Sequence, residues 1–512
     1  MSHLDHWLQQ GAGQDNARMA STAETNGAGA ERLPPARARI AANFLTLAST
    51  SVLGLMVTIL ISIYVRRVLG PAAVGQVAWA MAAVGYLTVL VTPGLATVGQ
   101  RELARHPERS EQLLALVLTL QTLLAAVVYG VVLVIAALEP RGPVVSVLLA
   151  VQGLTLFLTA WNISWVLQAH ERMVAPSLAA LAFNALQLPA LVLLVHVPED
   201  LVLYAALALP FTLAGMIWNF WYMRRRVLVR VSLLRPTLAG ARSMFRDAWP
   251  LALAQAATLV TLHSGTLILG FTDGDEAVGQ FSSAYRLMMV AAVITAALWN
   301  AYFSAFARSH DHPPEATELS REYLGLLAWM GLPMAALGWA LGRHVIELLY
   351  GPAFAPAGHY FEWLCLAIGL IFLNYGLVAT CVPWGRSDLH FKITAAAAVF
   401  NLAISAVTMP LYGAWGAIAA TLASELLIVA LGLVVRRRLR LFWHPMLPII
   451  GPPFLCSAAV AATIVLLPAS LDNLWPLQLL AGAAVLGACL VAFEWRAIFR
   501  LRAKLNARRK SG

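Results

Sequence analysis

The sequence contains few charged residues and few cysteines. Asp, Glu, Lys and Arg make up 12% of its 512 residues, about half of their usual share in a soluble domain. The cysteines lie inside apolar runs, without the spacing of a metal site or a disulfide framework: Cys365, Cys381, Cys456 and Cys489. We therefore expect small buried apolar residues here, and no metal site anywhere in the chain.

Other absences narrow the function. No glycine-rich phosphate loop of the Walker type occurs, so ATP is not the energy source within this chain. No large outer loop could carry catalytic acids, which argues against an enzyme such as a polysaccharide polymerase or a glycosyltransferase. No soluble stretch could form a folded basic domain, so the net charge of +10 does not indicate a nucleic-acid partner.

Long apolar runs are abundant instead. Hydrophobic residues make up 60% of the chain, and each run of about 20 residues is long enough to cross a roughly 30 Å hydrocarbon layer as a helix. The runs are continuous, whereas barrel strands alternate, so the sequence predicts an all-α polytopic membrane protein. We expect about fourteen transmembrane helices, near residues 43–65, 77–99, 113–137, 144–167, 175–197, 201–222, 249–271, 281–306, 324–349, 359–382, 393–410, 415–435, 447–467 and 477–493.

The basic residues predict the orientation. If the N-terminus is inside, 30 of the 35 Lys and Arg residues fall on inner segments. One, Arg286, lies within a predicted helix, and the outer side carries only Arg66, Arg67, Arg141 and Arg343. This asymmetry predicts both termini on the cytoplasmic side and inner ends that contact anionic membrane lipids.

A repeated tetrapeptide indicates an internal duplication. AVGQ occurs at residues 73–76 and 277–280, an offset of 204, and two arginine triplets begin at Arg224 and Arg436, an offset of 212. We interpret these pairs as marks of two pseudo-symmetric six-helix lobes with parallel topology, followed by two extra C-terminal helices. The glycine of each AVGQ is expected to make a tight turn at a helix start.

The predicted organisation has six parts. The first residues are rich in Gly, Ala, Ser and Gln and have no periodicity, as in disordered segments. The parts are a disordered cytoplasmic tail at 1–38, an N-terminal lobe at 39–226, a cytoplasmic linker at 227–248, a C-terminal lobe at 249–438, appended helices at 439–493 and a basic cytoplasmic tail at 494–512.

Several stretches together resemble one family. They are "NFLTLASTSVLGLMVTILISIYVRRVLGPAAVGQVAWA", "GLATVGQRELARH", "AVGQFSSAYRLMM" and "YGAWGAIAATLASE". Over residues 40–440 the chain resembles the flippases for O-antigen and exopolysaccharide units, whose superfamily also holds multidrug and toxin extrusion transporters and lipid II flippases. No single motif carries this resemblance, which rests on the order of several short ones.

The resemblance implies a function and a location. The substrate would be an undecaprenyl-pyrophosphate-linked oligosaccharide, moved by alternating access from the inner to the outer leaflet of the bacterial cytoplasmic membrane. The partners would be this lipid-linked oligosaccharide, membrane lipids, and the polysaccharide polymerase and glycosyltransferases of the same route. The chain would hold no cofactor, and a proton or sodium gradient would drive it.

Arg286 is the first candidate for substrate contact. An arginine inside a membrane helix costs at least about 2.5–3.5 kcal/mol on insertion scales, so it is expected to face a cavity or a partner. A guanidinium is also a two-pronged donor suited to phosphate. The alternative is a side chain that extends to the outer interface.

Three further arginines are phosphate candidates. Arg66 and Arg67 lie at the outer end of the first predicted helix, where they would contact either substrate phosphates or lipid headgroups. Arg101, near Glu102 and Arg105, lies at the inner end of the second, either at the inner mouth of a cavity or as a solvated helix end.

Two acids are candidates for ion coupling or charge pairing. Glu425 lies near the middle of the twelfth predicted helix, where it would bind a proton, pair with an arginine or form a structural hydrogen bond. Glu362 opens the tenth predicted helix, and an interfacial position is the simpler interpretation.

Two other functions remain open at this point. One is an ion-coupled exporter of drugs or toxins with the same architecture, for which an acidic, aromatic cavity would be expected. The other is a membrane-embedded polysaccharide polymerase or glycosyltransferase.

Overall fold

A computed structural model describes residues 36–106, 110–170, 172–227, 238–309, 313–384, 386–439, 445–467, 475–489 and 492. The chain divides into two compact units, Met1–Ser49 and Thr50–Gly512. Every contact and cavity reported below lies within the second unit. The predicted terminal tails fall outside the described residues, apart from positions 36–38, and so does part of the predicted linker, at 228–237.

The described residues contain helices and no β-strand, which confirms the predicted all-α class. The α-helices are α2 (Ala36–Val91), α3 (Leu95–Arg105), α4 (Ser110–Leu138), α5 (Pro143–Gly153), α6 (Thr155–Ala160), α7 (Ser164–Ala169), α8 (Val174–Leu194), α9 (Leu201–Arg226), α10 (Leu238–Thr272), α11 (Gly274–Arg308), α12 (Pro313–Tyr350), α13 (Ala355–Leu377), α14 (Ser387–Tyr412), α15 (Ala414–Leu439) and α16 (Leu447–Leu466). A further apolar helix covers Trp475–Cys489. Three short 3-10 helices are η2 (Pro198–Asp200), η4 (Pro352–Phe354) and η5 (Ala379–Trp384).

The described helices give a count of candidate membrane crossings. In the described part of the chain, 11 helices are long and apolar enough to cross a membrane, or 12 if the bent α10 is one crossing. The predicted count of about fourteen is not confirmed. α2 contains both of the first two predicted spans, separated by the kink at Gly70, and the described part of the last predicted span is the shorter apolar helix Trp475–Cys489.

Each AVGQ glycine is a helical residue and not the turn residue predicted. The turns are made five residues earlier by Gly70 and Gly274, whose φ angles are 75° and 82°. Gly75 and Gly279 lie where α2 crosses α11. A Cβ on Gly75 would lie 1.7 Å from the carbonyl oxygen of Asp275, and neither helix could approach so closely with a side chain there. The glycines therefore serve close packing of two backbones.

The turn glycines mark one end of the helices. Positive φ angles occur at five connections on this end, at Gly70, Gly142, Gly274, Gly351 and Gly413. An ion pair between Arg141 and Asp275 and a hydrogen bond from Arg67 to the Leu349 carbonyl join these connections. The charge count predicts this end to face outward, and we call it the outer end.

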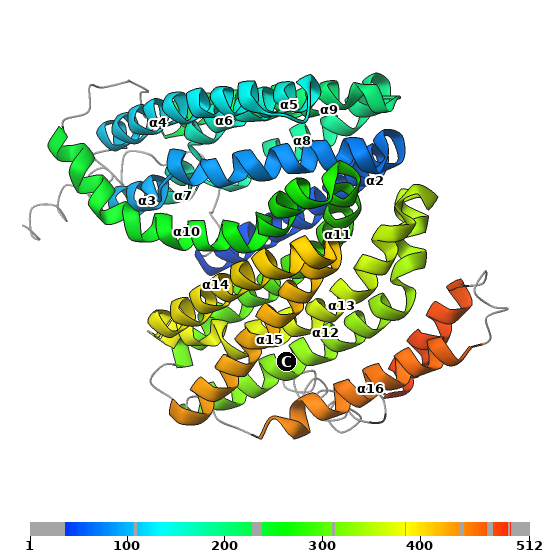
Figure 1. Ribbon diagram of the computed structural model, residues 1–512. Helices are drawn as coiled ribbons and strands as arrows, with labels where there is room; N and C mark the ends of the chain where they lie inside the picture. The colour runs from blue at the N-terminus through cyan, green and yellow to red at the C-terminus, as the bar shows by residue number, and fades with distance from the viewer. Residues whose placement is uncertain are drawn as a thin grey trace, which may run out of the picture. The chain divides into compact units, whose positions relative to one another are not determined.

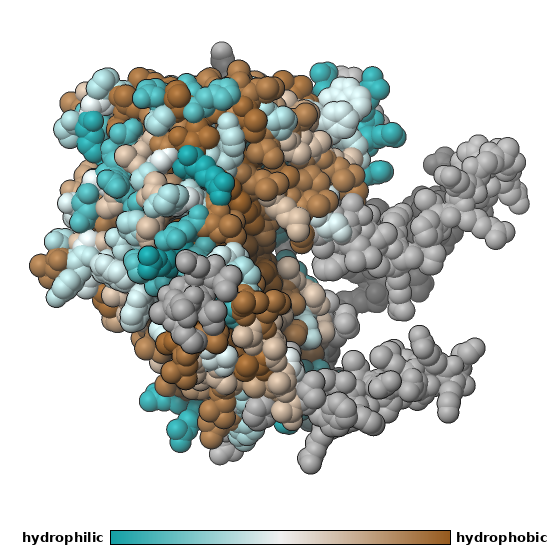
Figure 2. Space-filling model, turned by 90° about the vertical axis from the view of Figure 1, so that its right-hand side faces the viewer, coloured by the Kyte–Doolittle hydropathy of each residue, from teal (hydrophilic) through white to brown (hydrophobic). Residues whose placement is uncertain are grey.

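The helices form two groups with a boundary between them. In Figure 1, α4, α5, α6 and α9 lie in an upper group and α12 to α15 in a lower group, with α2, α10 and α11 between them. Many large apolar side chains are exposed, among them Val127, Leu138, Val399 and Leu411. They form part of the extensive apolar surface of which Figure 2 shows one face, and they suit contact with lipid. The boundary between the groups positions the candidate site.

Candidate functional site

A cavity of about 420 Å³ lies between α2, α9, α10, α11 and α12. Its walls therefore come from both predicted lobes. The described residues that line it include Arg66 from α2 and Arg286 from α11, but no Asp or Glu. We call it the basic cavity.

Arg66 is held in place by groups around its guanidinium. The side chain is 7% exposed. Its Nε donates to Ser283 Oγ at 2.7 Å, and its Nη1 donates to Ser62 Oγ. The ring centroid of Tyr350 lies 5.0 Å from the guanidinium carbon. Within the described residues Nη2 has no hydrogen-bond partner, so it is the donor left for a ligand.

Arg286 shares the basic cavity with Arg66. Its side chain is exposed. Neither arginine forms an ion pair with a carboxylate in the part of the chain that the structure describes. Two like charges in one cavity repel each other, and an anion between them would relieve that repulsion. The cavity is therefore suited to a phosphorylated group.

The other two phosphate candidates lie elsewhere. Arg67 is exposed, and its Nε donates to the carbonyl of Leu349 at 2.8 Å, with Nη2 on the carbonyl of Leu348. It thereby caps the C-terminal end of α12, where carbonyl groups have no partner within the helix. Arg101 is exposed on α3 and lines neither the basic cavity nor the one described next.

A second cavity, of about 580 Å³, holds Glu425. It is lined by α10, α11, α13, η5, α14 and α15, all within the predicted C-terminal lobe. Asn374 donates its side-chain amide to the Glu425 carboxylate, while its own Oδ1 is buried without a hydrogen bond. Trp299, Tyr375 and Phe391 add aromatic walls. We call it the acidic cavity.

The two cavities are neighbours. Leu262 lines both of them. The two cavities therefore meet at this side chain of α10.

Glu362 lies apart from both cavities. Its carboxylate pairs with His359 Nδ1 at 3.3 Å, one turn earlier on α13. This contact is an exposed pair on one helix, of a kind that contributes little to stability.

Sequence reasoning missed Arg436, which the charge count assigned to an inner loop. It is fully buried, and its guanidinium donates to the carbonyls of Gly376 and Leu377 and to the hydroxyls of Ser320 and Thr380. Arg436 therefore caps the end of α13. An arginine triplet gives no signal that distinguishes its buried member from the two exposed ones.

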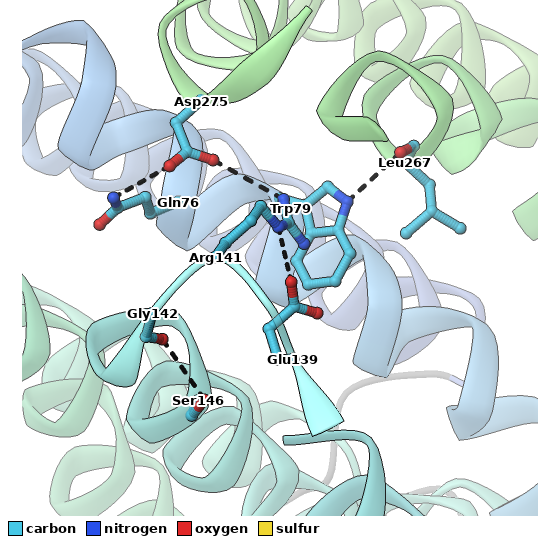
Figure 3. A network of polar contacts seen from close by, with 8 residues as sticks. All are labelled: Gln76, Trp79, Glu139, Arg141, Gly142, Ser146, Leu267 and Asp275. Carbon is cyan, nitrogen blue, oxygen red and sulfur yellow. Dashed lines mark hydrogen bonds and ion pairs between the residues drawn. The ribbon is translucent and has the colours of Figure 1, made fainter. Parts of the chain in front are cut away.

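A polar network at the outer end was also missed, because Arg141 was counted only as an outer charge. Figure 3 shows Arg141 between Glu139 and Asp275, beside the indole of Trp79. The guanidinium carbon lies 3.4 Å from the Trp79 ring centroid, and Nη1 lies 3.7 Å from the Asp275 carboxylate. Gln76 of the first AVGQ donates to the same carboxylate at 3.0 Å. The network joins the two predicted lobes.

Comparisons with known proteins give the context of this site. The family described as "Polysaccharide biosynthesis protein" matches residues 40–310, more than half of the chain. A protein of Shigella dysenteriae named "Putative O-antigen transporter" is 25% identical over 376 residues, which cover 72% of this chain and 92% of that protein.

Solved structures show the same fold. The structure titled "Lipid II flippase MurJ, inward closed conformation" has a TM-score of 0.73 at 11% identity and covers 89% of this chain and 100% of that one. An inward-facing multidrug resistance MATE family transporter of the MOP superfamily has a TM-score of 0.58 at 15% identity, covering 78% and 99%. These matches confirm the predicted resemblance, and the similar proteins are transporters and flippases, not enzymes.

Proposed function

This chain belongs to the polysaccharide biosynthesis protein family, and on that premise we propose that it flips a lipid-linked oligosaccharide across the bacterial cytoplasmic membrane. The substrate is an oligosaccharide unit attached to undecaprenyl pyrophosphate, and it moves from the inner to the outer leaflet. Both termini are cytoplasmic in this proposal, and the polymerase and glycosyltransferases of the route act on either side of the step.

The observation that carries the proposal is the pair Arg66 and Arg286 in one cavity without a lining acid. Charged residues within membrane helices usually face a cavity or a substrate pathway and not the lipid. A pyrophosphate offers two adjacent anionic groups, one for each guanidinium. The volume of about 420 Å³ lies in the range of small-molecule sites, so it suits the phosphate end of the substrate.

The position of the basic cavity suits alternating access. Its walls come from both predicted lobes, so a rocking motion between the lobes would expose it to one side and then to the other. Relatives named as an O-antigen transporter and a lipid II flippase support this mode of action.

The proposal is tested by complementation. In a strain that lacks the gene, the native chain should restore the surface polysaccharide, and Arg66→Ala and Arg286→Ala should each restore much less. Arg343→Ala is the matched control, because Arg343 is exposed and its ion pair within the described residues is with Glu347. Full restoration by both cavity variants at native membrane levels would refute the proposed role of the basic cavity.

We further propose that Glu425 couples flipping to an ion gradient. A carboxylate in a cavity beside an amide with an unpaired oxygen can hold a proton or a small cation such as sodium. The acidic cavity shares Leu262 with the basic cavity, so a change of charge at Glu425 would occur next to the substrate site.

The acidic cavity also favours a second candidate function, the export of cationic drugs. Glu425 with Trp299, Tyr375 and Phe391 is an acidic, aromatic setting that would suit an organic cation. Efflux of a cationic dye from cells that produce the chain tests this alternative. We expect no efflux above the empty-vector level, because the cavity between the lobes is basic.

A further inference from the structure

At the outer end the two AVGQ segments lie in backbone contact, and we call this contact between Gly75 and Gly279 the seal. A Cβ on Gly75 would lie 1.7 Å from the Asp275 carbonyl oxygen, and a Cβ on Gly279 would lie 1.8 Å from the carbonyl oxygen of Pro71. The backbones of α2 and α11 therefore touch at this crossing. The Arg141 and Gln76 contacts to Asp275 lie at the same place (Figure 3). This closed contact leaves no room for a side chain.

The seal connects directly to Arg66. Ser283 lies one helical turn after Gly279, and its hydroxyl donates to the Gly279 carbonyl at 2.6 Å. The hydroxyl oxygen of Ser283 in turn accepts the hydrogen bond from Arg66 Nε at 2.7 Å. Arg66 belongs to α2 and Ser283 to α11, so this bond bridges the two helices that the glycines bring together.

Tyr350 makes a second contact of the same kind. It is the last residue of α12, and its ring lies under the Arg66 guanidinium. Both groups that position Arg66 from outside its own helix thus come from the predicted C-terminal lobe. From within α2, the described contact to its guanidinium comes from Ser62.

From these contacts we propose that closure of the Gly75–Gly279 crossing positions Arg66 for the anion, with Ser283 and Tyr350 as its positioning residues. Separation of α2 from α11 at the outer end breaks the bond to Ser283 and removes Tyr350 from the guanidinium. Affinity for the anionic lipid then falls when the outer end opens, and the substrate is released outward. This inference rests on the proposed function.

Binding of undecaprenyl pyrophosphate, the carrier without its sugar, tests the positioning role. The purified full chain in detergent should bind this lipid, and Ser283→Ala should bind it roughly tenfold more weakly, the effect of losing a hydrogen bond to a charged group. Ser283→Thr keeps the hydroxyl and should keep the affinity. Equal affinity in Ser283→Ala and the native chain would overturn the proposal.

Spin labels test the link to the seal. Labels on Leu138→Cys and Tyr412→Cys, both exposed at the outer end of different lobes, report its opening. Gly75→Ala should move the labels apart and weaken lipid binding roughly tenfold. Gly130→Ala is the control, since a Cβ there meets no atom within 4 Å. If Gly75→Ala fails to fold, Asp275→Asn weakens the seal without added bulk and should shift both readings in the same direction.

The outcomes separate this inference from the proposed function. If Arg66→Ala weakens lipid binding but Gly75→Ala, with its labels moved apart, does not, the positioning inference is wrong. The proposed role of the basic cavity in binding then remains supported. If neither the native chain nor the variants bind the lipid, the proposed function fails first. If the labels separate and affinity falls together, while Gly130→Ala changes neither, both are supported.

Discussion

The basic and acidic cavities differ in where they lie as well as in charge. The basic cavity is built from both predicted lobes, whereas the acidic cavity lies wholly within residues of the predicted C-terminal lobe. A site between lobes changes shape when the lobes move. A site within one lobe can keep its ligand while they move.

This difference suggests a division of labour. An anionic substrate that must be exposed to both membrane faces suits the cavity between the lobes. A driving ion suits the cavity inside one lobe, where its binding can bias the position of that lobe. Leu262, which lines both cavities, is the side chain through which one cavity would influence the other.

Removal of both arginine charges should greatly lower the affinity of the basic cavity for an anionic lipid. We expect the double variant Arg66→Met with Arg286→Met to lose roughly 100-fold or more in affinity for a pyrophosphate lipid, since each charged hydrogen bond contributes about 1.5–3 kcal/mol. Titration of the purified chain with undecaprenyl pyrophosphate measures this change. Native affinity in the double variant would remove the basic cavity from the account.

Removal of the Glu425 charge should abolish the response to an ion gradient and leave substrate binding unchanged. Glu425→Gln keeps the shape of the side chain but cannot carry a charge. In vesicles, we expect this variant to flip lipid-linked substrate without a response to a proton or sodium gradient, and to bind the substrate as the native chain does. Runs with each gradient alone identify the ion. A full response to both gradients in Glu425→Gln would rule out its coupling role.

A comparison of the buried arginines Arg66 and Arg436 tests whether Arg66 serves ligand binding or the stability of the fold. Arg436 uses all three guanidinium nitrogens on protein groups, whereas Arg66 keeps Nη2 free among the described residues. Arg436→Met leaves two helix-end carbonyls unsatisfied, so we expect it to lower the free energy of unfolding by about 1–3 kcal/mol. Arg66→Met should leave stability unchanged or raise it, because a buried charge disappears.

Thermal unfolding of the two variants in one detergent measures this difference. An equal drop in melting temperature for Arg66→Met and Arg436→Met would mean that Arg66 is mainly structural.

The smallest effect is expected at Arg67. Arg67→Ala removes two hydrogen bonds to the end of α12, at a cost of about 1 kcal/mol of stability. Its effect on affinity for undecaprenyl pyrophosphate should stay within about threefold, an exposed charge being screened by solvent. A loss as large as that of Arg66→Ala would place Arg67 in the binding site after all.

The sequence predicted the membrane helices and the charged residues inside them, but it did not predict the directions and contacts of individual side chains. Continuous apolar runs predict membrane helices, because lipid leaves backbone groups no other partner. The insertion cost of a charge singled out Arg286 and Glu425, and both line cavities. Arg66 and Arg67 could not be told apart, because their roles depend on which way each side chain points from α2. The AVGQ repeat marked a real contact, yet only the packing of α2 on α11 shows that its glycines meet.

The most direct test of the account is flipping by the purified chain in sealed vesicles. We predict that it moves a fluorescent sugar linked to undecaprenyl pyrophosphate between leaflets, does not move a neutral lipid with the same sugar, and loses the activity with Arg66→Ala. Equal movement of the charged and the neutral lipid, or undiminished movement in Arg66→Ala, would contradict it.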